Sequence, residues 1–493
     1  MATNTDNIYL EDVKKLAKSF QDKANELLIG HEEIDYPLSK NILSLIDKIQ
    51  VQEDDSEYEI FKYQDKLNDL WSKLISSSIV SLRFFDKREP FCKKGVKKVP
   101  HAYGIDSLCN YFKKYTDFES VMYGGSKYYR DHLVHVFRVW LLGIDLLLKE
   151  DGKYLQAIKL PDDNTANEIE KVSMWTIIAL THDLGYPLEK ALSVIERTKD
   201  MMSLFVVNPV VTMDLSFNGV QNSMNDYILR LISSKMRQAS PDKADQFVAR
   251  LQSKYYFKFQ KSLEHNKHGI LSAIIIYKLL LYFLESDYSI NEDYTFTKED
   301  SRQFYIRREI LRAIASHTCH DVYQLDATSF SFFLILCDDA QEWGRKYISE
   351  LYIDKSNSYS LGGVKIELEG DTYKISLKDK YTVSEKYNFR NTIIKRFISQ
   401  SLDYRDIFRD GQDTDKRNFE FIRKTEVEVT KAENVTFQFQ LVISTKEQTK
   451  ILITKDNGDG KVIDDLHEIK EDFEKFGIIN PLEDGKKIEA CLF

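Results

Sequence analysis

The histidines are the residues of this 493-residue chain whose types and spacing are best suited to chemistry, because seven of the ten lie between positions 132 and 320. Six of those seven form pairs spaced three residues apart: His132 with His135, His265 with His268, and His317 with His320. Residues at this spacing share one face of a helix, and each pair adjoins an apolar helical pattern. Neutral imidazole is the commonest protein metal ligand. The pattern therefore predicts imidazoles that converge on a divalent metal ion.

The seventh histidine is followed directly by an aspartate, in the doublet His182-Asp183. Apolar residues recur at helical spacing over residues 172–181, and Gly185 with Pro187 provides a helix stop signal. A carboxylate at the end of a core helix costs several kcal/mol unless it is paired or binds a metal. Taken alone, the doublet also fits a helix cap with a hydrogen-bonded histidine. Together with the histidine pairs, it favours a metal site.

The order of these residues resembles that of the HD-domain superfamily of metal-dependent phosphohydrolases. In that family a histidine, a His-Asp doublet, further histidines and a distant aspartate follow one another, and the resemblance covers roughly residues 125–345. It implies a helical HD-domain bundle and the following metal ligands: His135, His182, Asp183, His268, His317, His320 and Asp338. Only one of His317 and His320 is needed, and Asp339 is the alternative to Asp338.

The resemblance also implies an activity, the hydrolysis of a phosphoester bond in a nucleotide or another phosphorylated small molecule. One or two divalent ions (Mn, Fe, Mg or Zn) would be the cofactor, and Asp183 with His182 would serve catalysis by holding them. The extra histidines favour a two-metal, phosphodiesterase-like site. A single-metal dNTP triphosphohydrolase, an alarmone hydrolase, and a nucleotide sensor without turnover are the alternatives.

Three further residues are candidates for binding the substrate. Arg138 lies one helical turn after His135, where it could contact a substrate phosphate and assist catalysis, although a structural ion pair is the alternative. Tyr186 stands three residues after the aspartate of the doublet, where some family members have a lysine. Arg345 follows the closing aspartates and is expected to line the same pocket.

Composition restricts the class of protein and its partners. The net charge of −9 does not favour duplex nucleic acid as a partner, and five scattered cysteines without a CxxC motif indicate neither a zinc knuckle nor a disulfide framework. No apolar stretch reaches the roughly 20 residues that a membrane span needs, and no signal peptide is visible. We expect a cytoplasmic protein without a membrane partner, and an oligomer is possible.

The period of the apolar pattern changes from 3.6 residues to 2 after about residue 350, which indicates helices followed by strands. The fold class is therefore predicted to be mainly α, with a small α+β domain at the C-terminus that would have a regulatory or oligomerising role. The predicted domains are a helical N-terminal region over 1–120, an HD domain over 121–350 with an insertion at about 190–262, and the α+β domain over 351–493. Helices are expected in that last domain near residues 389–398 and 466–476.

Overall fold

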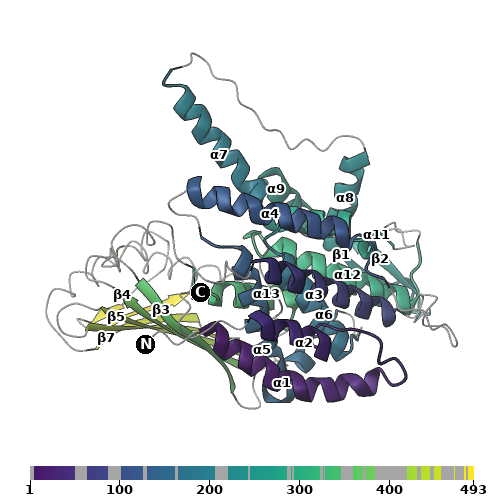
Figure 1. The fold of residues 1–493 in the computed structure, drawn as a ribbon, viewed down its shortest axis with the longest axis horizontal. Helices are drawn as coiled ribbons and strands as arrows, with labels where there is room; N and C mark the ends of the chain where they lie inside the picture. The colour runs from purple at the N-terminus through teal and green to yellow at the C-terminus, as the bar shows by residue number, and fades with distance from the viewer. Residues whose placement is uncertain are drawn as a thin grey trace.

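The computed structural model describes most of the chain up to residue 345 and the strands of a sheet beyond it. The described residues are 5–49, 64–86, 101–125, 130–161, 165–205, 220–242, 245–285, 290, 294–322, 326, 328–345, 359–369, 373–383, 419–429, 435–444, 449–456, 471, 482–484 and 487–492. Figure 1 shows the helices gathered in one body and the C-terminal strands in a sheet beside it.

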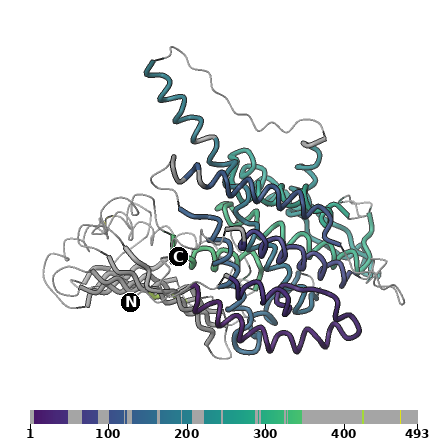
Figure 2. Tube along the Cα trace, in the orientation of Figure 1, coloured from purple at the N-terminus to yellow at the C-terminus, as the bar shows by residue number. Residues whose placement is uncertain are grey.

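The structure is mainly helical, which confirms the predicted fold class at that level. The helices are α1 (Thr5–Leu27), α2 (Lys40–Ile46), the short 3₁₀ helix η1 (Asp47–Ile49), α3 (Gln64–Phe84), α4 (Ile105–Gly125), α5 (Leu133–Ala157), α6 (Glu168–Thr181), α7 (Tyr186–Met202), α8 (Val220–Ser233), α9 (Ser253–Glu264), α10 (His268–Leu279), α11 (Leu281–Leu284), α12 (Lys298–Ser316) and α13 (Phe330–Ala340). In Figures 1 and 2 α1 runs alongside α5, and α7 projects from the body of the molecule.

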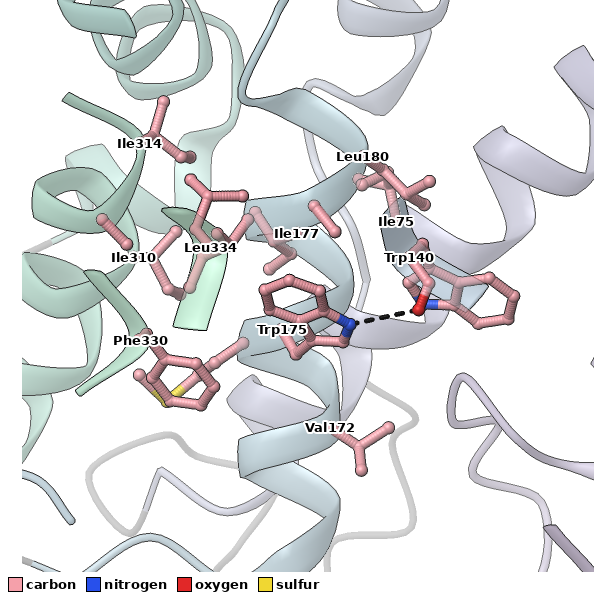
Figure 3. Close-up of a cluster of buried hydrophobic side chains, with 14 of the residues drawn as sticks. Ile75, Trp140, Val172, Trp175, Ile177, Leu180, Ile310, Ile314, Phe330 and Leu334 are labelled. Carbon is pink, nitrogen blue, oxygen red and sulfur yellow. Dashed lines mark hydrogen bonds between the residues drawn. The ribbon is translucent and has the colours of Figure 1, made fainter. Parts of the chain in front are cut away.

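Helix α6 is the centre of the core and packs against α3, α5, α12 and α13. Its side chains from Val172 to Thr181 are all buried, so the helix is apolar around most of its circumference, as a central helix must be. Figure 3 shows Trp175 between neighbouring helices, where its indole nitrogen donates a hydrogen bond to the carbonyl oxygen of Trp140 at 3.2 Å. Burying side chains of this size contributes roughly 1.5–3 kcal/mol each. The core therefore fixes the position at which α6 ends.

Both ends of α6 are set by local sequence. At the start, the side chain of Asn167 accepts from the backbone N–H of Glu170 and the side chain of Glu170 accepts from that of Asn167, which is a capping box. At the other end the helix stops at Thr181, just before the doublet that was expected in its last turn, and Pro187 does not lead into a loop. It lies in the first turn of α7 instead, where proline is well tolerated. A short turn between two helices therefore carries the His-Asp doublet.

A small β-hairpin lies within the predicted insertion, between α8 and α9. Strand β1 (Ser234–Gln238) pairs with the antiparallel strand β2 (Phe247–Leu251). This hairpin was not predicted, because strands of five residues with mixed polar and apolar side chains give no extended alternation in the sequence.

The C-terminal strands form one sheet in the order β3-β4-β5-β6-β7-β9-β8. They are β3 (Tyr359–Glu369), β4 (Tyr373–Val383), β5 (Phe419–Val429), β6 (Val435–Ser444), β7 (Thr449–Asp456), β8 (Leu482–Asp484) and β9 (Lys487–Leu492). All pairs are antiparallel except β4 with β5, which are parallel. The alternating segments are therefore strands, as predicted. The helices expected near residues 389–398 and 466–476 lie outside the described residues, apart from residue 471.

Within the part of the chain that the structure describes, no helix is both long enough and apolar enough to cross a membrane.

Candidate metal centre

Five helix ends bring the predicted metal-ligating residues together. Each residue lies at or just beyond the end of a helix: His135 in the first turn of α5, His182 and Asp183 after α6, His268 at the start of α10, His317 after α12, and Asp338 in the last turn of α13. The ends of these packed helices meet on one side of the core. The named residues therefore form a single cluster, although they are spread over the sequence from position 135 to position 338.

The two carboxylate oxygens of Asp183 face different histidines. Oδ2 lies 3.9 Å from His135 Nε2 and 3.5 Å from His182 Nε2, whereas Oδ1 lies 3.3 Å from His268 Nε2 and 3.6 Å from His317 Nε2. Asp183 is therefore placed between two pairs of imidazole nitrogens. This is the geometry of a carboxylate that can bridge two cations.

Asp338 completes the first of these groups. Its Oδ1 lies 2.8 Å from His135 Nε2 and 3.8 Å from His182 Nε2. His135, His182 and Asp338 offer ligand atoms that all lie within 4.8 Å of one another. We call these three residues with Asp183 Oδ2 site 1, and His268 and His317 with Asp183 Oδ1 site 2.

The turn that carries the doublet is held by hydrogen bonds from two other helices. The hydroxyl of Tyr111 on α4 donates to the carbonyl oxygen of Leu184 at 2.7 Å, and the backbone N–H of Gly185 donates to Ser272 Oγ on α10 at 2.7 Å. Gly185 lies so close to α10 that a Cβ there would come within 2.4 Å of the His268 carbonyl oxygen. The close approach joins sites 1 and 2 into one rigid unit.

Two of the histidines are oriented by the helices that they terminate. Nδ1 of His182 donates to the carbonyl oxygen of Ala179 at 2.8 Å, and Nδ1 of His317 donates to that of Ile314 at 2.6 Å. A backbone carbonyl only accepts, so the proton is on Nδ1. In the neutral form of both residues the Nε2 lone pair consequently faces the cluster.

The other two histidines have side-chain partners at Nδ1. His135 bonds to the amide oxygen of Gln341, and His268 bonds to Oε2 of Glu189 at 2.7 Å. Partners of this kind commonly orient metal-ligating histidines. Sequence reasoning missed Glu189, which no motif marks, although its place one turn after Tyr186 on α7 puts it on the face towards α10.

Whether a metal ion would fit the cluster can be judged from its buried polar atoms. His182 Nε2 and His317 Nε2 are buried and have no hydrogen-bond partner within the part of the chain that the structure describes. Buried nitrogen atoms without partners are rare in proteins and need a specific reason. Imidazole and carboxylate ligands together suit Mn, Fe and Zn. Site 1 therefore fits a divalent ion, and His182, Asp183 and His317 form a second group whose ligand atoms lie close enough to hold one.

Burial and mutual charge set the protonation states of the cluster. Burial alone would raise the pKa of Asp183 and of Asp338, but the surrounding histidines outweigh it and hold both pKa values well below the usual range. Burial lowers the pKa of His135 and of His317, which favours the neutral imidazole that a metal requires. For His268, burial is outweighed by hydrogen bonds to carboxylates, and its pKa rises to about 9.

The structure corrects the role expected for Arg138. Its guanidinium is buried and donates to both carboxylate oxygens of Asp6 on α1, from Nε at 2.9 Å and from a terminal nitrogen at 2.8 Å. A second terminal nitrogen donates to the carbonyl oxygen of Trp343 at 3.3 Å. Because these partners engage the guanidinium away from the cluster, Arg138 forms a structural ion pair and is not placed to act in catalysis or substrate binding.

Tyr186 and Arg345 both lie at the edge of the cluster. The ring of Tyr186 stacks on His132 with 3.7 Å between centroids and presents its edge to His268 at 5.5 Å. Arg345 is partly buried, its Nε donates to the carbonyl oxygen of Asp131 at 3.2 Å, and its charge contributes to lowering the pKa of His135. Both residues therefore lie beside the space that a small molecule bound at the cluster would occupy.

The structure also distinguishes between the alternative ligands that the sequence left open. His320 has an exposed side chain in a turn beyond α12, so it lies outside the cluster and His317 is the member of the pair that contributes. Asp339 forms an ion pair with Arg423 on β5 at 2.8 Å, which leaves Asp338 as the carboxylate of site 1. His320 is accordingly removed from the expected ligands.

Comparison of the chain with protein-family models, with curated proteins and with solved structures found no match to any of them.

Proposed function

We propose that this chain is a metal-dependent phosphohydrolase of the HD-domain type that binds two divalent ions and hydrolyses a phosphoester bond of a nucleotide. The observation that carries the proposal is the position of Asp183, whose two oxygens face the histidines of site 1 and of site 2. A buried carboxylate in this position serves no evident packing purpose, whereas it is the group that a pair of neighbouring cations needs.

Each ion would have ligands from this chain alone. His135, His182, Asp338 and Asp183 would hold the first ion, and His268, His317 and Asp183 would hold the second. When bound, such ions supply an activated water molecule and offset negative charge on the phosphoryl oxygens. Mn, Fe, Mg and Zn are the candidate ions, and the mixed nitrogen and oxygen ligands favour the transition metals among them.

The residues at the edge of the cluster would bind the substrate. Arg345 would attract and orient a phosphate group, since a guanidinium forms strong, directional hydrogen bonds with phosphate oxygens. Tyr186, whose ring stacks on the buried His132 and lies beside His268 of site 2, is partly exposed and would suit the base or sugar of a nucleotide. Asp183 and His182 act in the reaction by holding the ions in place, and the buried walls of the cluster limit the access of bulk water.

The test is to measure metal content and hydrolysis with matched histidine variants. We expect wild-type chain purified without chelator to bind about two equivalents of Mn(II) per chain and to hydrolyse bis(p-nitrophenyl) phosphate or cyclic nucleotides. Asp183→Ala should lose both ions and all turnover, and His317→Ala should lose the ion of site 2. His320→Ala is the control and should behave as wild type.

The outcomes separate the proposal from its alternatives. One equivalent of metal with activity towards dNTPs or alarmones would replace the two-metal phosphodiesterase by a single-metal hydrolase. Nucleotide binding without turnover in the metal-loaded chain would indicate a sensor. A wild-type chain that binds no Mn(II), Fe(II), Zn(II) or Mg(II) would refute the proposal.

A further inference from the structure

Gln341 fixes the orientation of the site 1 histidine on α5. Its side chain is fully buried, its amide nitrogen donates to the carbonyl oxygen of Trp343 at 2.8 Å, and its amide oxygen bonds to His135 Nδ1. Because the carbonyl of Trp343 can only accept, the amide nitrogen must face it and the amide oxygen must face His135. In neutral His135 the proton then lies on Nδ1, and the Nε2 lone pair is directed at site 1, where Asp338 Oδ1 lies 2.8 Å away.

Trp343, which orients Gln341, is itself held by the N-terminal helix. Its indole Nε1 donates to Asp6 Oδ1 at 2.8 Å, and its ring stacks on Tyr9 with 5.2 Å between centroids. Asp6 also accepts the two hydrogen bonds of Arg138, whose guanidinium reaches the Trp343 carbonyl oxygen. All five side chains of this network, those of Asp6, Tyr9, Arg138, Gln341 and Trp343, are buried.

The backbone after Trp343 shows how closely the loop is fitted to Arg138. Gly344 has φ +68°, a conformation that favours glycine, and a Cβ at this position would lie 2.4 Å from a terminal nitrogen of Arg138. The backbone conformation and the close approach to Arg138 therefore both favour glycine at position 344.

We propose that Gln341, Trp343 and Asp6 are positioning residues for the metal ion of site 1, so that helix α1 belongs functionally to the metal centre. This inference rests on the proposed function, because it assumes that His135 is a ligand. Asp6 fixes the position of the Trp343 indole, and the Trp343 carbonyl fixes the orientation of the Gln341 amide. The amide oxygen in turn selects the tautomer of His135. Site 2 lies outside this series of contacts, since its histidines are oriented by Glu189 and by the carbonyl of Ile314.

The experiment is a titration of the metal-free, full-length chain with Mn(II), followed by electron paramagnetic resonance. Loss of a group that orients a metal-ligating histidine typically costs 10- to 100-fold in metal affinity. We expect Gln341→Leu to weaken one of the two Mn(II) sites at least about 10-fold and to leave the other unchanged. Asp6→Asn should weaken the same site by a smaller factor. Asp12→Asn, a partly exposed position on the same helix, is the matched control and should leave both sites unchanged.

Gln341→Glu separates the positioning role from a purely structural one. Its carboxylate can still accept from His135 Nδ1 but cannot donate to the Trp343 carbonyl, so it should destabilise the fold yet bind Mn(II) at site 1 more tightly than Gln341→Leu. Equal loss at site 1 in both variants, or unchanged affinity in Gln341→Leu while wild type binds two ions, would overturn this inference alone. A wild-type chain that binds no Mn(II) would overturn the proposed function and this inference with it.

Discussion

His268 has a carboxylate at each of its ring nitrogens, so the proposed binding of a metal ion at site 2 is expected to depend on pH. Asp183 Oδ1 lies 3.3 Å from Nε2 and Glu189 Oε2 lies 2.7 Å from Nδ1. Burial would lower the pKa of His268, but the two carboxylates outweigh burial and raise the pKa to about 9. At neutral pH the raised pKa favours protonated His268, and an ion that binds site 2 would have to displace the proton on Nε2.

The expected result is a metal affinity at site 2 that falls about tenfold for each pH unit below 9. Isothermal titration calorimetry with Mn(II) at several pH values, in buffers of different ionisation enthalpy, would give both the affinity and the number of protons released. An affinity that does not change between pH 6.5 and pH 8.5 would contradict the protonated state of His268.

The same proton affects the stability of the metal-free chain. The folded pKa of His268 lies above its ordinary value of 6.5, so the folded state binds the proton more tightly than the unfolded state. The contribution is fully present below pH 6.5 and is lost as the pH rises through 9. Glu189→Gln should lower the pKa of His268 and flatten this part of the pH profile, measured by urea unfolding and by NMR of the imidazole. Glu196→Gln, an exposed position on the same helix, is the control.

At the scale of elements, the contact between α5 and α6 depends on the absence of a side chain at one position. A Cβ at Gly143 would lie 2.1 Å from Cζ2 of Trp175. Overpacking of this kind costs about 1–3 kcal/mol, whereas alanine in place of glycine in a helix gains up to about 1 kcal/mol. We expect Gly143→Ala to destabilise the wild-type chain on balance, because the indole cannot move within the packed core shown in Figure 3.

The control is a double-mutant cycle with Trp175→Leu, measured as the free energy of unfolding in urea. In the Trp175→Leu background the smaller side chain leaves space for the added methyl group, so Gly143→Ala should be neutral or stabilising there. The same loss of stability in both backgrounds would show that the cost arises elsewhere than in the contact with the indole.

The order of elements explains which parts of the site the sequence could predict. An apolar segment followed by histidine or aspartate marks a helix end in the core, and this pattern located Asp183 and Asp338. The three-residue histidine spacing was less informative than expected, because no pair lies within one helix. His132 precedes α5, His265 follows α9, and both His317 and His320 lie beyond α12, so the two members of a pair do not share a helix face.

The roles that sequence could not predict depend on residues distant in the chain. Arg138 appeared suited to phosphate binding because its partner, Asp6, is 132 positions away. Gln341 and Glu189 orient histidines 206 and 79 positions away, respectively. No local pattern records such pairs, because they are set by how the helices pack. In contrast, the C-terminal strands could be predicted, since alternation is a local property of each strand.

At the scale of the whole molecule, the C-terminal sheet contacts the helical body one residue from site 1. Arg423 on β5 is buried, and its guanidinium donates to Asp339 at 2.8 Å, while β3 packs against α5. Asp339 is adjacent to Asp338 in the last turn of α13. A shift of the sheet would therefore change the position of a site 1 carboxylate, and the regulatory role predicted for the C-terminal domain would act through this contact.

The prediction is that Arg423→Gln weakens Mn(II) binding at site 1 several-fold without changing site 2, because it leaves the carboxylate of Asp339 without this guanidinium and allows the end of α13 to shift. Lys424→Gln, an exposed position next to it on β5, is the control and should bind both ions as wild type does. Manganese titrations of the two full-length variants would decide the matter. If both variants bind as wild type, the Arg423–Asp339 pair only attaches the sheet to the helices, and the sheet's function must be sought on another of its surfaces.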